Sequence, residues 1–181
     1  MLTKNGVYGC PICDFISSED ADIIYEGRHN VVALNPRISP HPFRTAIIPI
    51  RHVGCEGLYG MNSLSMNERI EYKNARKRAT DAIIKSANET GNILRTREGQ
   101  PLVDYLERPS VHWSGDLIPQ YDGAAKIGGM TFPTYSDADV QGVGPAPVIV
   151  ASFPKDRLDL VMDKKVRTEM ARLLRKNFEF C

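Results

Sequence analysis

Four cysteines and four histidines are the side chains of this 181-residue chain best suited to metal binding or nucleophilic chemistry. Two of them form the C-x-x-C pair Cys10 and Cys13. Such a pair suits a metal site or redox chemistry, and two ordinary buried thiols are the plain alternative. A redox pair normally lies where a strand leads into a helix. Because the residues after Cys13 suggest further β-structure, we favour a metal.

A closed zinc site needs two more nitrogen or sulfur ligands to complete a tetrahedron. The best candidates are His52 and His112, and Cys55 competes through the spacing His52-x-x-Cys55. From spacing alone, these alternatives stay open. His29 and His41 lie in loop-like contexts with no evident partner.

Elements that position these residues are indicated by the hydrophobic pattern. Short strands are expected in the first quarter of the chain and again before Pro119, separated by Gly, Asn-Pro and Ser-Pro turns. A further strand is expected near the start of the last quarter. The ranges are 23–25, 31–34, 45–49, about 111–118, and 148–151.

Two helices are predicted. Ser65 to Glu68 fits a capping box, in which the Ser and Glu side chains accept hydrogen bonds from free backbone N–H groups, and Gly91 would end that helix. The segment 121–147 is rich in Gly, Pro and Asp and is expected to be a loop. A C-terminal helix is indicated by one apolar stripe: Val166, Met170, Leu173, Leu174 and Phe178.

Composition indicates one globular domain. The hydrophobic share is 42%, the charged share 25% and the net charge +1. A near-neutral chain gives no argument for nucleic-acid or membrane binding. No apolar run approaches a membrane span and the N-terminus has no apolar signal core, so the cytoplasm is the expected compartment. We expect a single domain over 1–181, with a core at about 9–130 and a loop and C-terminal strand/helix extension at 131–181.

Several motifs occur in the order typical of one superfamily. They are Cys10-Pro11-Ile12-Cys13, Asn35-Pro36, Ile48-Pro49-Ile50-Arg51-His52-Val53, Gly91-Asn92, Gly99-Gln100 and His112-Trp113-Ser114-Gly115-Asp116-Leu117-Ile118-Pro119. The ordered set resembles the histidine-triad / galactose-1-phosphate uridylyltransferase superfamily, in its zinc-containing branch.

This resemblance implies an α+β fold, with an antiparallel sheet, a long packed helix and, here, an added C-terminal helix. It implies one structural zinc ion held by Cys10, Cys13, His52 and His112, which makes Cys55 an incidental thiol. It implies binding of a nucleotide or nucleotide conjugate, hydrolase or nucleotidyltransferase chemistry at the α-phosphate, and a homodimer. Substrate-binding roles are carried over to four residues: Asn35, Asn92, Gln100 and Gln120.

The nucleophile position is the main departure from the superfamily. Since alternate residues of a strand face the same side, His112, Ser114 and Asp116 would project together. Ser114 stands where the superfamily has the histidine that attacks phosphorus, and Asp116 stands where it has glutamine or histidine. A serine hydroxyl needs a general base, and a carboxylate is a weak one unless it is desolvated.

Three explanations for Ser114 stay open: a pseudoenzyme that binds without turnover, direct attack by water, or a substitution introduced on purpose. Other departures are Ala33 in place of an acidic ribose ligand, Phe43-Arg44 in place of Gly-His, Gln120 in place of arginine, and an apparent insertion at 101–109. The alternative function is a non-catalytic zinc-knuckle interaction protein that uses the segments 101–109 and 121–147 to hold a partner. A related nucleic-acid repair enzyme would need a basic patch that is lacking here, so nucleic acid is not expected as a partner.

Overall fold

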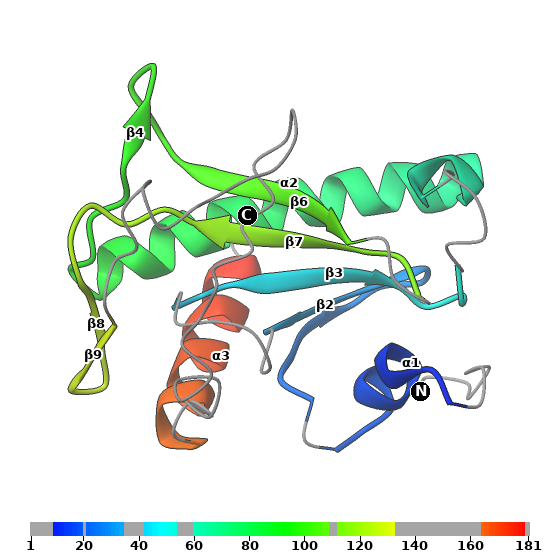
Figure 1. Cartoon of the computed structure of the whole chain (residues 1–181), viewed down its shortest axis with the longest axis horizontal. Helices are drawn as coiled ribbons and strands as arrows, with labels where there is room; N and C mark the ends of the chain where they lie inside the picture. Colours follow the sequence, from blue (N-terminus) through cyan, green and yellow to red (C-terminus); the bar gives the residue numbers. More distant parts are fainter. Residues whose placement is uncertain are drawn as a thin grey trace, which may run out of the picture.

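A five-stranded antiparallel sheet forms the centre of the computed structural model, which describes residues 9–19, 21–34, 42–53, 60–108, 112–132 and 164–179 (Figure 1). The strand order is β1-β2-β3-β7-β6. The bounds are β1 Ile23–Glu26, β2 Asn30–Leu34, β3 Thr45–Pro49, β6 Val103–Arg108 and β7 Ser114–Pro119. Together with the helices described below, this sheet confirms the expected α+β class.

The first three strands match the sequence prediction to within a residue. All five residues of β2 and of β3 are buried, as expected of central strands covered on both faces. Their register pairs Asn30 with Pro49 and Leu34 with Thr45. The segment between them, 35–41, lies outside the described residues and includes Asn35 and His41.

The segment expected to be an insertion contains β6, an edge strand that pairs along the whole of β7. Val103 lies opposite Pro119, and Arg108 lies opposite Ser114. None of the side chains of β6 is fully buried, so the strand has only a weak hydrophobic pattern in the sequence. β7 begins at Ser114, later than expected, and keeps Pro119 as its last residue; Val111 lies outside the described residues.

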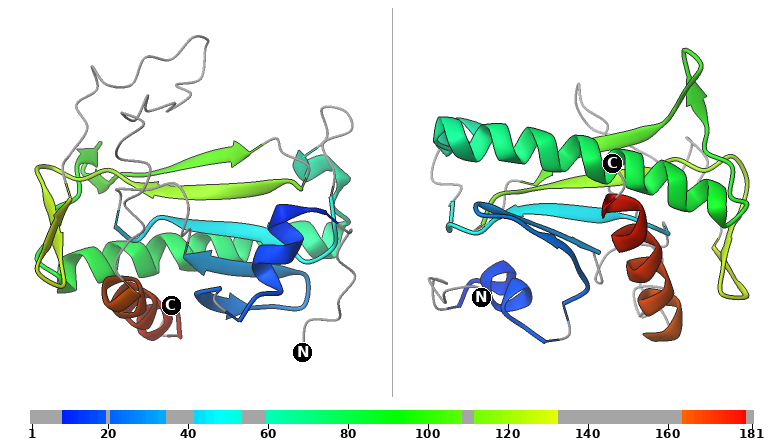
Figure 2. Two further views of the ribbon diagram at one scale, coloured as in Figure 1. Left: turned by 60° about the horizontal axis from the view of Figure 1, so that its bottom comes forward. Right: turned by 180° about the vertical axis from the view of Figure 1, so that it is seen from behind.

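Helices α2 (Met66–Glu89) and α3 (Lys164–Glu179) cover one face of the sheet (Figure 2). The capping box at Ser65 and Glu68 is present, which confirms the predicted helix start. The predicted stripe of α3 is fully buried and joins the main core, so this helix is part of the domain's interior. None of the described helices is both long and apolar enough to cross a membrane.

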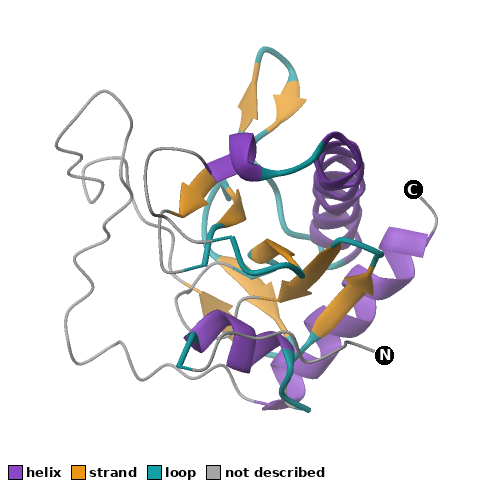
Figure 3. Cartoon of the chain, turned by 90° about the vertical axis from the view of Figure 1, so that its right-hand side faces the viewer, coloured by secondary structure: helices purple, strands orange, loops and turns teal. Residues whose placement is uncertain are grey.

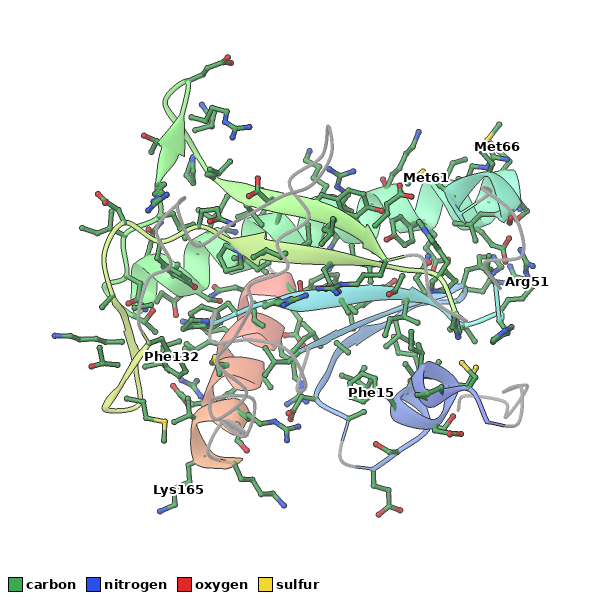
Figure 4. The ribbon with its side chains drawn as sticks, viewed as in Figure 1. Phe15, Arg51, Met61, Met66, Phe132 and Lys165 are labelled. Carbon is green, nitrogen blue, oxygen red and sulfur yellow. The ribbon has the colours of Figure 1, made fainter. Side chains whose placement is uncertain are left out.

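The opposite face carries a short helix, α1 (Pro11–Ile16), where the sequence had suggested β-structure. Cys10 is its N-cap: its sulfur accepts the Cys13 backbone N–H at 3.5 Å, and Pro11 fits the first helical position because it has no N–H to satisfy. Ile16 packs on Ala46 and Ile48 of β3 together with Phe15, which extends from α1 beneath the sheet (Figure 4).

Smaller elements lie at the margins of the sheet (Figure 3). Two hairpins occur, β4–β5 (Thr96–Arg97 and Gln100–Pro101) and β8–β9 (Ala125–Ile127 and Met130–Phe132), with a 3-10 turn at Gly60–Ser63. The β8–β9 hairpin corrects the loop prediction for part of 121–147, because the Gly128-Gly129 pair supplies the positive φ angles that a tight turn needs. The strand expected at 148–151 lies outside the described residues.

Helix α2 approaches the sheet closely at Gly115. A Cβ atom there would lie 2.1 Å from Tyr72 Oη and 2.4 Å from a ring carbon of Tyr105. The hydroxyl groups of Tyr72 and Tyr105 form a hydrogen bond of 3.1 Å, and Tyr72 has no exposed surface. Only glycine therefore allows β7 to lie against this tyrosine pair.

We expect Gly115→Ala to lower the free energy of unfolding by about 1–3 kcal/mol, because the added methyl group overpacks a closed site. Chemical denaturation measures this change. Ser114→Ala, the neighbouring position on the opposite face of β7, is the matched control and should change stability little. A Gly115→Ala protein as stable as the control would show that the tyrosine pair yields freely.

Candidate metal centre and strand-face site

Four potential metal ligands converge at one end of the sheet, on the face that carries α1. Cys10 and Cys13 come from the start of α1, His52 from the segment after β3, and His112 from the segment before β7. Their ligand atoms all lie within 4.8 Å of one another. Three of the side chains are buried and His52 is partly buried, so the cluster is largely shielded from water.

The spacing of these atoms fits a tetrahedral ion. Cys13 Sγ lies 3.4 Å from His52 Nδ1 and 3.3 Å from His112 Nδ1, and Cys10 Sγ lies 3.8 Å from His112 Nδ1. Zinc bonds of about 2.3 Å to sulfur and about 2.0–2.1 Å to nitrogen place tetrahedral ligands about 3.5 Å apart. The observed separations cluster around that value.

The tautomer of His112 also suits a metal. Its Nε2 lies 2.9 Å from the carbonyl oxygen of Pro49, which can only accept, so Nε2 carries the proton and Nδ1 presents its lone pair to the sulfurs. Burial lowers the pKa of the His112 imidazole, although its contact with the Pro49 carbonyl opposes the shift, so the neutral form is favoured. The four residues thus fit a structural zinc ion, with no ligand position left for water.

Asp116 and Ser114 lie farther along β7 on the same face, and both are buried. The Asp116 carboxylate forms ion pairs with two arginines: the buried Arg44, which immediately precedes β3, and Arg108 at the end of β6, whose Nε lies 2.7 Å from Asp116 Oδ2. Burial lowers the pKa of the Arg44 guanidinium, and the charge of Asp116 opposes that shift. Together, the side chains of Arg44, Arg108 and Asp116 carry a net charge of +1.

Ser114 lacks the base that a serine nucleophile requires, as far as the described residues go. No hydrogen bond joins its hydroxyl to Asp116 there, and the two arginines bind that carboxylate. His112 faces the metal cluster. His29 lies just before β2, where its backbone N–H donates to Glu71 of α2, the helix that covers the other face of the sheet.

Sequence reasoning missed Arg108 as a site residue and noted Arg44 only as a departure from the superfamily. Arg108 would have emerged from the register of β6 on β7, because it lies directly opposite Ser114. Arg44 would have emerged from the register of β3 on β7, because the next residue, Thr45, lies opposite Leu117. The weak apolar pattern of β6 hid that strand. Arg108 is a basic residue three positions before the strand expected at about 111–118, in a segment taken as an insertion. Its sequence context alone therefore does not indicate a site residue.

The expected substrate ligands at the other end of β7 do not meet Ser114. Gln120 is six residues along the strand, which corresponds to about 20 Å at about 3.3 Å per residue. Gln100 is exposed in the β4–β5 hairpin beyond that end. Asn92 ties the end of α2 to β8, donating to the Lys126 carbonyl at 3.0 Å and accepting from its N–H at 2.7 Å. Asn35 and Cys55 lie outside the described residues.

Comparison with solved structures identifies the fold. The chain matches a hypothetical histidine triad nucleotide-binding protein from Sulfolobus tokodaii with a TM-score of 0.54 and 14% identity, over 94% of this chain and 93% of that one. It matches a zinc-bound histidine triad family protein from Mycobacterium smegmatis with a TM-score of 0.53 and 17% identity, over 97% and 96%. A Hit-like protein involved in cell-cycle regulation from Bartonella henselae matches with a TM-score of 0.51 and 11% identity, over 87% and 86%.

No family model and no curated protein sequence matches the chain. The class of protein is thus defined by its structure: an α+β domain with a Cys2His2 cluster beside its central sheet. More particularly, this is the histidine-triad fold, as the motif order implied. Across nearly the full length of the two higher-scoring structures, the likeness extends beyond the conserved-looking motifs to the arrangement of the whole sheet.

We expect the purified protein to contain one zinc ion per chain and to lose thermal stability when a strong chelator removes it, because metal binding to a closed site contributes directly to folding. His112→Ala should lower zinc affinity by more than the 10–100-fold typical of removing a residue that only orients a ligand. Elemental analysis and a thermal melt measure the two effects.

Ser114→Ala is the matched control for His112→Ala, because it lies two residues away on the same face and is not a ligand. It should retain full zinc content and nearly the same melting temperature. Zinc-free protein as purified, or a disulfide between Cys10 and Cys13, would contradict the assignment.

Proposed function

We propose that this protein binds nucleotides or nucleotide conjugates through a phosphoryl group beside Ser114. The observation that carries the proposal is the shared face of β7: the candidate zinc ligand His112, then Ser114, then Asp116 with its two arginines. This order and spacing match the strand on which the resemblance places phosphate chemistry. A hydroxyl and a net positive, largely buried cluster suit an anion.

The chemistry that we propose at this site follows from what Ser114 lacks. A histidine at this position would attack phosphorus and form a covalent nucleotidyl intermediate, dividing one displacement into two easier ones. The described residues provide Ser114 with no base for this step, so we propose that this protein binds its ligand and turns it over slowly or not at all. Positioning and electrostatic stabilisation alone leave a residual rate about 10³–10⁴-fold over water in other enzymes.

Assembly as a homodimer is part of the proposal. β6 is the last strand of the sheet order, and the outer face of α2 exposes Met66 and Ile70, which lie one turn apart. An edge strand and exposed apolar side chains are each suited to contact with a second copy. We also retain the cytoplasm as the proposed compartment.

The alternative, a non-catalytic zinc-knuckle interaction protein, loses part of its basis. It would use the segment 101–109, taken as an insertion, to hold a partner, whereas most of that segment is β6, a strand of the central sheet. The other segment required, 121–147, contains the β8–β9 hairpin in its described part.

Ligand binding should raise the melting temperature, because a ligand that binds only the folded state stabilises it. We expect at least one of AMP, UMP and GMP to do so in a thermal-shift assay. No shift with any nucleotide, including conjugates such as dinucleotides, phosphoramidates and nucleotide sugars, would favour the interaction-protein alternative.

Ser114→His should enable the protein to form a covalent nucleotidyl intermediate. We expect this variant, incubated with a radiolabelled nucleotide donor and quenched in base, to retain label as a phosphohistidine, while the protein as given retains none. Ser114→Gln, a polar side chain of similar size that is not a nucleophile, is the matched control. Label on the unsubstituted protein at another histidine would mean that the nucleophile lies elsewhere.

A further inference from the structure

Arg108 is unusual among the residues around Ser114 because it is anchored at one end and accessible at the other. Within the described part of the chain, the one hydrogen bond of its side chain runs from Nε to Asp116 Oδ2, at 2.7 Å. Its side chain is 32% exposed, whereas those of Asp116 and Arg44 are 2% and 5% exposed. A guanidinium has five N–H donors, so the two terminal nitrogens retain four for a ligand.

Arg108 lies beside the proposed phosphate site. It lies directly opposite Ser114 in the register of β6 on β7 and shares that residue's face of the sheet. Asp116, two residues along β7, holds the Nε end, and the buried Arg44 binds the same carboxylate oxygen, Oδ2. Such an anchored guanidinium loses little freedom when it binds a planar pair of phosphate oxygens.

We propose that Arg108 is the phosphoryl-binding side chain of this protein and that Asp116, as its positioning residue, tunes the site to phosphoryl groups with a single negative charge. This inference rests on the proposed function and names its ligand class: the internal phosphate of an ester, anhydride or phosphoramidate.

The charge preference follows from the cluster's net charge of +1. Attraction to that charge doubles when a phosphate goes from one negative charge to two, whereas the Born cost of removing the ion from water quadruples. In a largely buried site, a singly charged phosphoryl group is therefore neutralised at the lower desolvation cost. Without the charge of Asp116, the site would carry +2 and would suit a dianion.

The test compares AMP, UMP and GMP with their methyl esters by titration calorimetry at about pH 7.5. At that pH a monophosphate is mostly a dianion, because its second pKa is about 6, and its methyl ester is a monoanion. We expect the esters to bind at least as tightly as the monophosphates. Arg108→Gln should weaken both about tenfold or more, as expected on loss of a charged hydrogen bond, and the monophosphates more than the esters.

Two further variants separate positioning from charge. Arg108→Lys keeps the positive charge but lacks the planar guanidinium that Asp116 holds in place. It should therefore recover only part of the nucleotide affinity that Arg108→Gln loses. Asp116→Asn should move the ratio of the two affinities toward the monophosphates by about tenfold. Arg172→Gln, which removes an exposed arginine paired with Glu169 on α3, is the charge-matched control and should bind like the unsubstituted protein.

Failure of this inference is distinguishable from failure of the proposed function. If nucleotides bind but Arg108→Gln binds them as well as the Arg172→Gln control, Arg108 is not the phosphoryl ligand. If Asp116→Asn is folded by circular dichroism and leaves the ratio unchanged, Asp116 does not set the charge preference. Should Asp116→Asn not fold, equal losses for esters and monophosphates in Arg108→Gln would overturn the charge preference. If no form binds any probe, both proposals fall.

Discussion

The alternation of side chains along β7 is the constraint on which the other features depend. Gly115 and Leu117 face α2 and the main core, and Ser114 and Asp116 face the side that carries α1. The two faces of β7 therefore have different environments. The face toward α2 is tightly packed and apolar, and the face toward α1 carries the paired charges. A shift of register by one residue would exchange the two faces, placing a carboxylate against the Tyr72 hydroxyl.

The parts of the fold that were predictable from sequence are those with a local or periodic signal. The capping box at Ser65 and the apolar stripe of α3 each depend on a few neighbouring residues. α1 was missed because a helix of six residues is too short to show a repeating apolar pattern, and Pro11 at its first position was the main local indication. β6 was missed because its side chains are half-buried and its stability comes from pairing with β7, which no local pattern reveals.

The candidate site divides along the same line. The cysteine pair and the histidines were identifiable because their types are scarce and their spacing is informative. The arginine–aspartate cluster was not, because charged residues are common and their pairing is a property of the register. Phe43 illustrates the difference: it keeps a positive φ of 62°, at a cost of about 1–3 kcal/mol, where the resemblance has glycine. Its fully buried ring, which joins the main core, offsets that strain. The next residue, Arg44, lies just before β3 and pairs with Asp116.

The three-part origin of the metal ligands has a consequence for the order of events in folding. Cys10 and His112 are 102 positions apart in sequence, and only Cys10 and Cys13 are neighbours along the chain. A chain still emerging from the ribosome can therefore offer zinc two thiolates, but the four-ligand site exists only after β3 and β7 have paired. Closing so long a loop is a slow, entropically costly step, so full-affinity metal capture belongs to the end of the pathway. In that order of events, the four-ligand ion stabilises a sheet that has already formed.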